Sequence, residues 1–207
     1  VPAGGYRADS SGEDMELVVR MHRMLRDRRQ PYKVTFVPEP VCWTEAPEDI
    51  ATLRNQRIRW QRGLSESLAA NWGLMFNRRG GVPGWFAFPF MVLFEWLGPM
   101  VELGGYLFMA VAFMLGAISW PAFAVFLFVA IGLGILLSAS ALMLEEMSFH
   151  MYPKGKHILL LGLAVVLENF GYRQVNSWWR LVGLYRWARQ AESSWGTMTR
   201  SAAWQSK

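Results

Sequence analysis

One predicted helical face of the sequence brings polar, cationic and aromatic groups together. Four residues spaced at i, i+3, i+4 and i+7 fall on one side of a helix: Gln56, Arg59, Trp60 and Gly63. A guanidinium fork binds an anion such as a pyrophosphate, an indole ring stacks on a sugar, and a glycine leaves space beside both. A basic helix that touches lipid headgroups next to a membrane is the simpler alternative.

Two carboxylates, Glu13 and Asp14, lie upstream of this face, where the sequence predicts the start of another helix. Ser10 is the expected N-cap, and Glu13 is the acid that closes a capping box three residues later. The positive end of the helix dipole favours negative charge at this place. Asp14 is a candidate general base if it is held beside an acceptor hydroxyl, whereas a plain N-terminal cap is the alternative for both acids.

The elements that carry these groups are predicted to be two helices with a strand between them. Tyr32–Val37 alternates and is rich in β-forming residues, which predicts the strand. The second helix is expected to run from Pro47 to Phe76, and Gly80–Gly84 then breaks the chain. The first helix is expected to end at Asp27–Pro31 and to bury an apolar stripe made of Leu17, Val18, Met21, Met24 and Leu25.

The region after this break is typical of a membrane-embedded chain. Only Glu95 and Glu102 carry a charge between Gly80 and Leu144. Its length predicts an aromatic interfacial helix followed by two crossings, with the limits Trp85–Gly98, Pro99–Ile118 and Trp120–Leu144.

A third apolar segment, Ile158–Tyr172, is too short for a full crossing. As a helix it reaches about 22 Å, against a hydrocarbon core of about 30 Å, so we expect a partial or interfacial element. Positive charge favours the cytoplasmic side, and four arginines follow this segment: Arg173, Arg180, Arg186 and Arg189. Three carboxylates in apolar surroundings are expected to line a polymer channel, to pair between helices or to lie at the interface: Glu95, Glu102 and Glu168.

Composition excludes several other classes of protein. The net charge of +5 comes mostly from arginine, yet no basic and aromatic run resembles a nucleic-acid-binding module. Cys42 is the single cysteine and the three histidines are scattered, which excludes an intrachain disulfide and a Cys/His zinc motif. Because the sequence opens at Val1 without an initiator Met or a signal peptide, we expect the C-terminal portion of a longer protein. The expected domain limits are 1–83, 84–179 and 180–207.

Ordered motifs followed by membrane helices make the sequence similar to the processive membrane-embedded glycosyltransferases of family 2, such as cellulose, hyaluronan, chitin and poly-N-acetylglucosamine synthases. Gly12-Glu13-Asp14 resembles their Thr/Ser-x-Glu-Asp-type motif, apart from the glycine before the acids. Gln56-x-x-Arg59-Trp60 matches their Gln-x-x-Arg-Trp signature in full, and Cys42–Pro47 resembles the link that precedes that helix.

The resemblance implies an α/β domain of GT-A type, present here only as its mostly helical C-terminal part, followed by α-helical transmembrane segments. It implies an inverting transfer from a nucleotide-sugar donor, typically a UDP-sugar, to a growing polysaccharide that passes through the lipid bilayer. Asp14, next to Glu13, would be the catalytic base. Gln56 and Arg59 would line the acceptor and diphosphate region, and Trp60 would stack under the acceptor sugar. A non-processive enzyme acting on a lipid carrier and a non-catalytic membrane subunit are the alternatives.

Further expectations from the resemblance concern the metal, the tail and the location. Members of this family hold a divalent metal, Mg²⁺ or Mn²⁺, with an Asp-x-Asp motif, which does not occur in this sequence, so the chain by itself is expected to be inactive. The catalytic part is expected on the cytoplasmic side of a bacterial inner membrane. The tail resembles a gating motif with two residues inserted before the arginine, or is an ordinary interfacial segment: Trp195, Gly196, Thr197 and Arg200.

Overall fold

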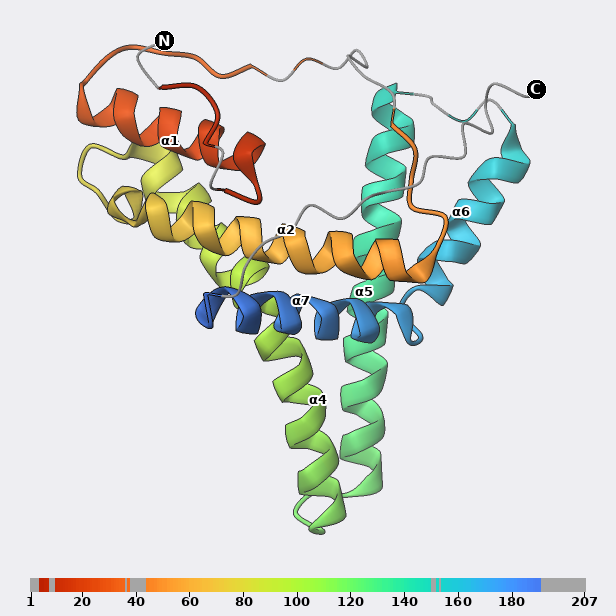
Figure 1. Cartoon of the computed structure of the whole chain (residues 1–207). Coiled ribbons are helices and arrows are strands. Elements are labelled where there is room, and N and C mark those ends of the chain that lie inside the picture. The colour runs from red at the N-terminus through yellow and green to blue at the C-terminus, as the bar shows by residue number, and fades with distance from the viewer. Residues whose placement is uncertain are drawn as a thin grey trace. The chain divides into compact units, whose positions relative to one another are not determined.

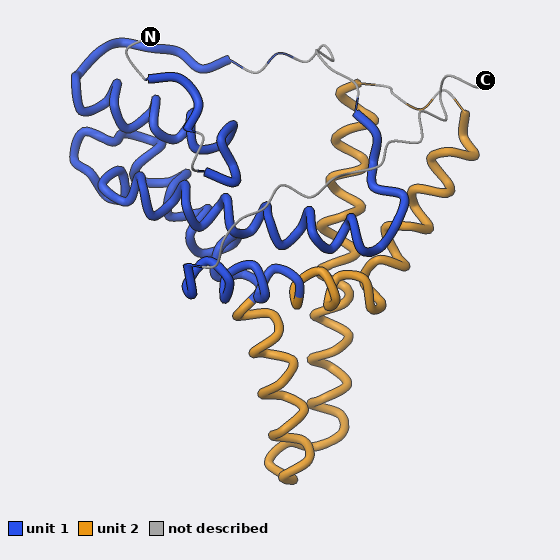
Figure 2. Tube along the Cα trace, viewed as in Figure 1, with its two compact units in different colours: residues 1–99, 179–207 blue, residues 100–178 orange. Residues whose placement is uncertain are grey.

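The computed structural model describes residues 4–7, 10–35, 37, 44–149, 152 and 154–190, and all regular structure in this part of the chain is helical (Figure 1). The chain divides into two compact units (Figure 2). Unit 1 comprises residues 1–99 and 179–207, and unit 2 comprises residues 100–178. The predicted domain limits at 83 and 179 remain predictions.

The strand predicted at Tyr32–Val37 is wrong for residues 32–35 and 37, which are irregular. A strand is stable only when a neighbouring strand accepts and donates its ladder hydrogen bonds, and the described part of the chain has no second strand. The GT-A assignment, which depends on a sheet, therefore stays a prediction.

Unit 1 is built on two long helices that pack side by side (Figure 1). They are α1 (Glu13–Asp27) and α2 (Ile50–Ala70). A short 3₁₀ turn, η1 (Trp72–Leu74), follows α2. A helical stretch with π-type turns then comprises η2 (Pro83–Ala87), α3 (Phe88–Phe90) and η3 (Met91–Trp96). The last part of α7 (Tyr172–Ala188), from Trp179 onward, also belongs to unit 1.

The predicted cap of α1 was wrong, although its start at the two acids and its end at Asp27 are confirmed. The N-cap is Gly12 without a side-chain cap, so Ser10 and Glu13 form no capping box. The Ser10 hydroxyl accepts a hydrogen bond from the Gly12 amide at 3.3 Å instead. Because the Ser10 hydroxyl bonds to the amide only two residues later, it stabilises the turn that precedes α1 and does not cap the first turn of the helix.

The buried face of α1 also differs from the predicted stripe. Val18 is 42% exposed, whereas Val19 and Glu16 are buried. The Glu16 carboxylate lies 3.1 Å from Arg20 Nε, and this ion pair offsets the free-energy cost of burying the charged carboxylate. The predicted stripe was based on apolar residues alone. It therefore missed the buried face of α1, which contains the ion-paired Glu16.

α2 is shorter at both ends than Pro47–Phe76. Asp49 caps it, because the Asp49 carboxylate accepts a hydrogen bond from the Thr52 amide at 2.8 Å. The hydrogen bonds from Thr52 lower the pKa of Asp49 from its ordinary value. The helix ends before Asn71, whose buried side chain donates to the Ser67 carbonyl at 3.0 Å. Side-chain hydrogen bonds at both ends thus set the limits of the helix.

A small apolar core holds unit 1 together between α1, α2 and the stretch Pro83–Trp96. Its members are buried to at least nine-tenths, and they are Val19, Leu64, Leu68, Leu74, Phe88 and Val92. The stretch Pro83–Trp96 also leaves an exposed aromatic row, in which Phe86, Phe90 and Phe94 contact one another in sequence. This agrees with an amphipathic element, one side of which packs on α1 and α2.

Unit 2 contains the most apolar helices. They are α4 (Gly98–Met114), α5 (Trp120–Phe149) and α6 (Gly155–Leu167). By length and composition α5 is long and apolar enough to cross a membrane. Up to three spans result if Pro83–Trp96 with α4, and α6 with α7, each count as one broken span. The second predicted crossing, Trp120–Leu144, therefore lies within the single helix α5. The first predicted crossing, Pro99–Ile118, corresponds to α4, which has 17 residues and is too short to qualify as a span by itself.

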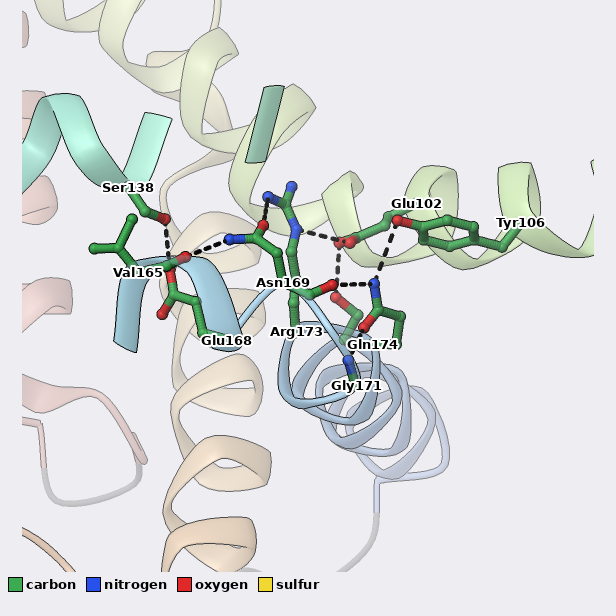
Figure 3. A network of polar contacts seen from close by, with 10 residues as sticks. Glu102, Tyr106, Ser138, Val165, Glu168, Asn169, Gly171, Arg173 and Gln174 are labelled. Atoms are coloured by element: carbon green, nitrogen blue, oxygen red, sulfur yellow. Dashed lines mark hydrogen bonds and ion pairs between the residues drawn. The ribbon is translucent and has the colours of Figure 1, made fainter. Parts of the chain in front are cut away.

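Polar side chains meet inside unit 2 where α6 ends and α7 begins (Figure 3). Arg173 Nε lies 2.8 Å from Glu102 Oε1, and the Ser177 hydroxyl donates to Glu102 Oε2 at 2.8 Å. The Ser138 hydroxyl donates to Glu168. Glu102 and Glu168 were expected to line a channel, to pair between helices or to lie at the interface. The structure gives direct contacts for pairing between helices.

Candidate functional site

The start of α1 and the middle of α2 touch each other through two glycines. A Cβ atom placed on Gly63 would lie 2.7 Å from the Gly12 nitrogen and 2.8 Å from its Cα. A Cβ on Gly12 would in turn lie 3.1 Å from the Gly63 Cα. Such distances leave no room for a side chain at Gly63, so backbone packs directly on backbone at this point.

Polar contacts fix this crossing in register. Glu66 Oε2 accepts a hydrogen bond from the Ser11 amide at 2.7 Å, and Glu66 Oε1 lies 2.7 Å from Arg62 Nε. One carboxylate of α2 thereby binds the segment that leads into α1. Towards the other end of α1, Arg23 donates to the Ala70 carbonyl at 2.6 Å. Hydrogen bonds on both sides of the glycines therefore restrict sliding and rotation of α1 against α2.

The opposite face of α2 packs on the part of α7 that belongs to unit 1. A Cβ on Gly183 would lie 2.6 Å from the Ile58 carbonyl oxygen. Beside it the buried Gln61 side chain accepts a hydrogen bond from Arg180 Nε at 2.8 Å and donates one to the Trp96 carbonyl at 3.3 Å. Arg180 also lies 3.2 Å from Glu95 Oε2. α2 is thus held on two sides by glycine contacts.

The structure places the two predicted groups of residues on neighbouring elements of unit 1. Glu13 and Asp14 follow Gly12 directly, and Arg59 and Trp60 precede Gly63 by about one turn on the same helical face. The glycine contact therefore brings the start of α1, with its two acids, to the face of α2 that carries the cation and the ring.

The individual side chains have the exposure that substrate binding requires. Asp14 is exposed, and its Oδ1 accepts a hydrogen bond from the Met15 amide at 2.8 Å. Glu13, Gln56 and Arg59 are half-buried. Trp60 is 50% exposed, and the Arg57 guanidinium lies over its ring, 4.8 Å from the centroid. This cation–π contact restrains the ring while half of its surface faces outward.

This arrangement can bind an anion and a sugar side by side. The start of α1 contributes backbone amides and the positive end of its dipole, and Arg59 contributes a second positive charge. Asp14 supplies a carboxylate within this positive field, and Trp60 supplies a flat apolar surface. In the described part of the chain no three His, Cys, Asp or Glu side chains gather as a metal ion requires.

Several parts of the prediction fall outside the described residues. The possible gating residues Trp195, Gly196, Thr197 and Arg200 lie there, and so does Cys42 in the link before α2.

Sequence reasoning missed the groups that position the site. Gly12 had been noted only as a departure from the family motif, although it is the residue that allows the close contact with Gly63. Gln61 and Gly183 were not singled out, because neither belongs to a motif.

Comparison with known proteins supports the family assignment. A model of the glycosyl transferase family group 2 matches residues 3–139, which include Glu13, Asp14 and the whole of α2. Searches of curated proteins and of solved structures each found no match. Because the matched region is more than half of the 207 residues and contains both groups of the candidate site, this chain belongs to the glycosyl transferase family group 2.

Proposed function

We propose that this chain is the C-terminal portion of an inverting, processive membrane glycosyltransferase, which extends a polysaccharide and passes it through the membrane. The observation that carries the proposal is the contact of Gly12 with Gly63, because it joins the Glu-Asp pair to the Gln-x-x-Arg-Trp face. Membership of the glycosyltransferase family supports a nucleotide-sugar donor in general, and we assign a UDP-sugar.

In the proposed reaction Asp14 accepts the proton of the acceptor hydroxyl, and the hydroxyl oxygen attacks the anomeric carbon of the donor. The bond between this carbon and the diphosphate oxygen breaks, and the nucleoside diphosphate leaves with the bonding electrons. Gln56 and Arg59 bind the diphosphate and the acceptor, and Trp60 stacks under the acceptor sugar. Glu13 supports the charge and position of Asp14.

A divalent metal, Mg²⁺ or Mn²⁺, belongs to this proposal for the intact enzyme, with ligands outside the residues described. The chain alone is then inactive, since the donor side is incomplete. The catalytic part lies on the cytoplasmic side of a bacterial inner membrane in this proposal, supported by the arginines of α7 and by the apolar length of α5.

The base is tested by Asp14→Asn in the intact enzyme. Asparagine keeps the shape and accepts the Met15 hydrogen bond, but it cannot take a proton, so polymer synthesis should fall by about 100-fold or more. Nucleotide binding and membrane insertion should remain. Asp27→Asn, the same change at the other end of α1, is the control and should retain synthesis. Normal synthesis by Asp14→Asn would refute the assignment.

The acceptor platform is tested by Trp60→Phe, Trp60→Ala and Arg59→Lys. A stacking surface predicts a severe loss of synthesis for alanine and a milder loss for phenylalanine, because only phenylalanine keeps a ring. Lysine should fail at position 59, since an ammonium cannot reproduce the guanidinium fork. Near-normal synthesis by Trp60→Ala would instead favour a helix that anchors to lipid. Transfer of a single sugar to a lipid carrier, without polymer, would favour the non-processive alternative.

A further inference from the structure

Unit 1 has an open pocket of about 380 Å³ at the end of α1 remote from Asp14. Its lining contains no acidic residue and consists of Arg26, Arg29, Gln30, Pro31 and Arg79. Arginines at a helix C-terminus are often explained by the helix dipole, which accounts for Arg26 and Arg29. The helix dipole does not account for Arg79. This residue lies in the loop before η2 and adds a third positive charge to the lining of the pocket.

The guanidinium of Arg26 is held in place rather than freely solvated. Arg26 Nε donates to the Tyr32 hydroxyl at 3.2 Å, and the guanidinium lies 5.3 Å from the centroid of the Tyr32 ring. On another side it lies against Gly81, where a Cβ would be 3.0 Å from the Arg26 guanidinium carbon. Gly81 has φ +56°, so the backbone conformation also disfavours a side chain there.

A histidine contacts the Tyr32 hydroxyl beside Arg26. His22 Nδ1 lies 2.6 Å from the Tyr32 hydroxyl. The same hydroxyl is therefore within hydrogen-bond distance of both Arg26 Nε and His22 Nδ1. Burial, and then the charge of Arg26, lower the pKa of His22 from its ordinary value. A lowered pKa favours the neutral histidine, which adds no further positive charge to this place.

The pocket is tied to the aromatic stretch that follows it. The Asn77 side chain accepts a hydrogen bond from the Arg79 amide at 2.9 Å, and the Asn77 carbonyl accepts one from Trp85 Nε1 at 2.9 Å. One residue therefore joins the loop of Arg79 to the start of the stretch Pro83–Trp96. The side chains of Trp85 and Phe86 are 55% and 69% exposed. Guanidinium groups next to exposed aromatic rings match the border between phosphate headgroups and acyl chains.

We propose that Arg26, Arg29 and Arg79 form a binding site for the phosphate of an anionic phospholipid, whose acyl chains lie along the exposed aromatic side chains of Pro83–Trp96. Three guanidinium groups supply paired N–H donors to the phosphate oxygens, and the anion relieves the repulsion among them. The site lies at the other end of α1 from the candidate base, and it is independent of the proposed transfer reaction.

The test compares two double variants of the full chain in neutral detergent. Arg29→Gln/Arg79→Gln removes two charges that line the pocket and leaves the anchored Arg26 intact. Arg28→Gln/Arg78→Gln removes two charges from the neighbouring positions, and neither of these residues lines the pocket. Binding of phosphatidylglycerol and of phosphatidylcholine is measured by native mass spectrometry, with circular dichroism as a check that each variant is folded.

The wild type should bind phosphatidylglycerol in preference to phosphatidylcholine. The pocket variant should bind phosphatidylglycerol about 10-fold more weakly or worse, and the control variant should stay within about 2-fold of the wild type. Equal losses in both double variants would show a diffuse electrostatic attraction and refute a site. Competition by inorganic phosphate at concentrations near that of the lipid phosphate would show a soluble ligand and refute the lipid assignment.

Discussion

The two units of this chain differ in whether they bury apolar side chains. All apolar side chains that are buried among the described residues belong to unit 1, namely Val19, Ile58, Leu64, Leu68, Leu74, Phe88, Pro89, Val92, Pro99 and Trp179. Unit 1 also buries polar side chains, such as Glu16, Gln61 and Asn71. In unit 2 the buried residues of the described part are Gly134, Asn169 and Ser177, while its large apolar side chains are mainly exposed.

We expect this difference if unit 1 lies in water and unit 2 among lipid chains, because α5 is long and apolar enough to cross a membrane. In water, apolar burial drives packing, and unit 1 has a core of that kind. Among lipid chains an outward leucine gains nothing by turning inward, so small residues and hydrogen bonds hold helices together instead. In unit 2, Gly134 fits this description, because a Cβ there would lie 2.1 Å from Asn169 Oδ1 and 2.5 Å from Arg173 Nη1.

The largest expected effect comes from the same truncation in both units. Leu68→Ala removes a side chain that is 2% exposed and should cost about 2–5 kcal/mol in the free energy of unfolding. Leu137→Ala removes one that is 66% exposed and should cost less than about 0.5 kcal/mol in lipid nanodiscs. Chemical denaturation of both variants measures the difference. Equal costs would mean that the exposed face of α5 packs on protein, and the comparison would fail.

The glycine contact of unit 1 gives a second, smaller effect. Gly63→Ala places a methyl group against the Gly12 backbone and should destabilise the protein by about 1–3 kcal/mol. Gly73→Ala is the matched control, because nothing lies within 4 Å of a Cβ at that position. In the intact enzyme Gly63→Ala should also reduce synthesis, since it moves Asp14 relative to Trp60. A stability for Gly63→Ala equal to that of the control would show that α1 moves away freely.

The polar network of unit 2 can be measured by a double-mutant cycle on Glu102→Gln and Arg173→Gln. We expect a coupling of about 1 kcal/mol, because lipid does not compete for these groups as water does. The equivalent cycle on Arg62 and Glu66 in unit 1 should give about 0.3–0.5 kcal/mol, typical of an i,i+4 pair in water. A coupling near zero for Glu102 and Arg173 would remove the ion pair from the interactions that hold unit 2.

The smallest expected effect concerns His22 and pH. Its pKa is lowered in the folded protein, so the unfolded chain binds a proton more readily as the pH falls through the ordinary histidine value of about 6.5. Stability should therefore decrease from pH 7.5 to pH 5.5. His22→Asn keeps an acceptor for Tyr32 but does not titrate, so its stability should vary less over this range. Identical pH profiles for the variant and the wild type would contradict the burial of a neutral His22.

Sequence reasoning located the helices better than it located their contacts. Local sequence pattern predicted the end of α1 at Asp27. The spacing of residues along one helix likewise placed Gln56, Arg59 and Trp60 on one face of α2. The contact of Gly12 with Gly63 and the partners of Glu102 depend on residues about 50 to 75 positions apart, which periodicity does not record. The strand at Tyr32–Val37 was predicted from residue type, although a strand depends on its neighbours.

The fit of Gly12 against Gly63 also constrains how relatives of this chain can diverge. A bulkier residue at one of these positions would separate the two helices, so it is tolerated only together with a change that lets them move apart. The two positions should therefore co-vary among relatives, with glycine at 63 accompanying a small residue before the Glu-Asp pair. In members with Gly-Glu-Asp upstream, the Gln-x-x-Arg-Trp signature would then extend to Gln-x-x-Arg-Trp-x-x-Gly. The longer pattern would identify new sequences in which the two helices meet as closely as they do here.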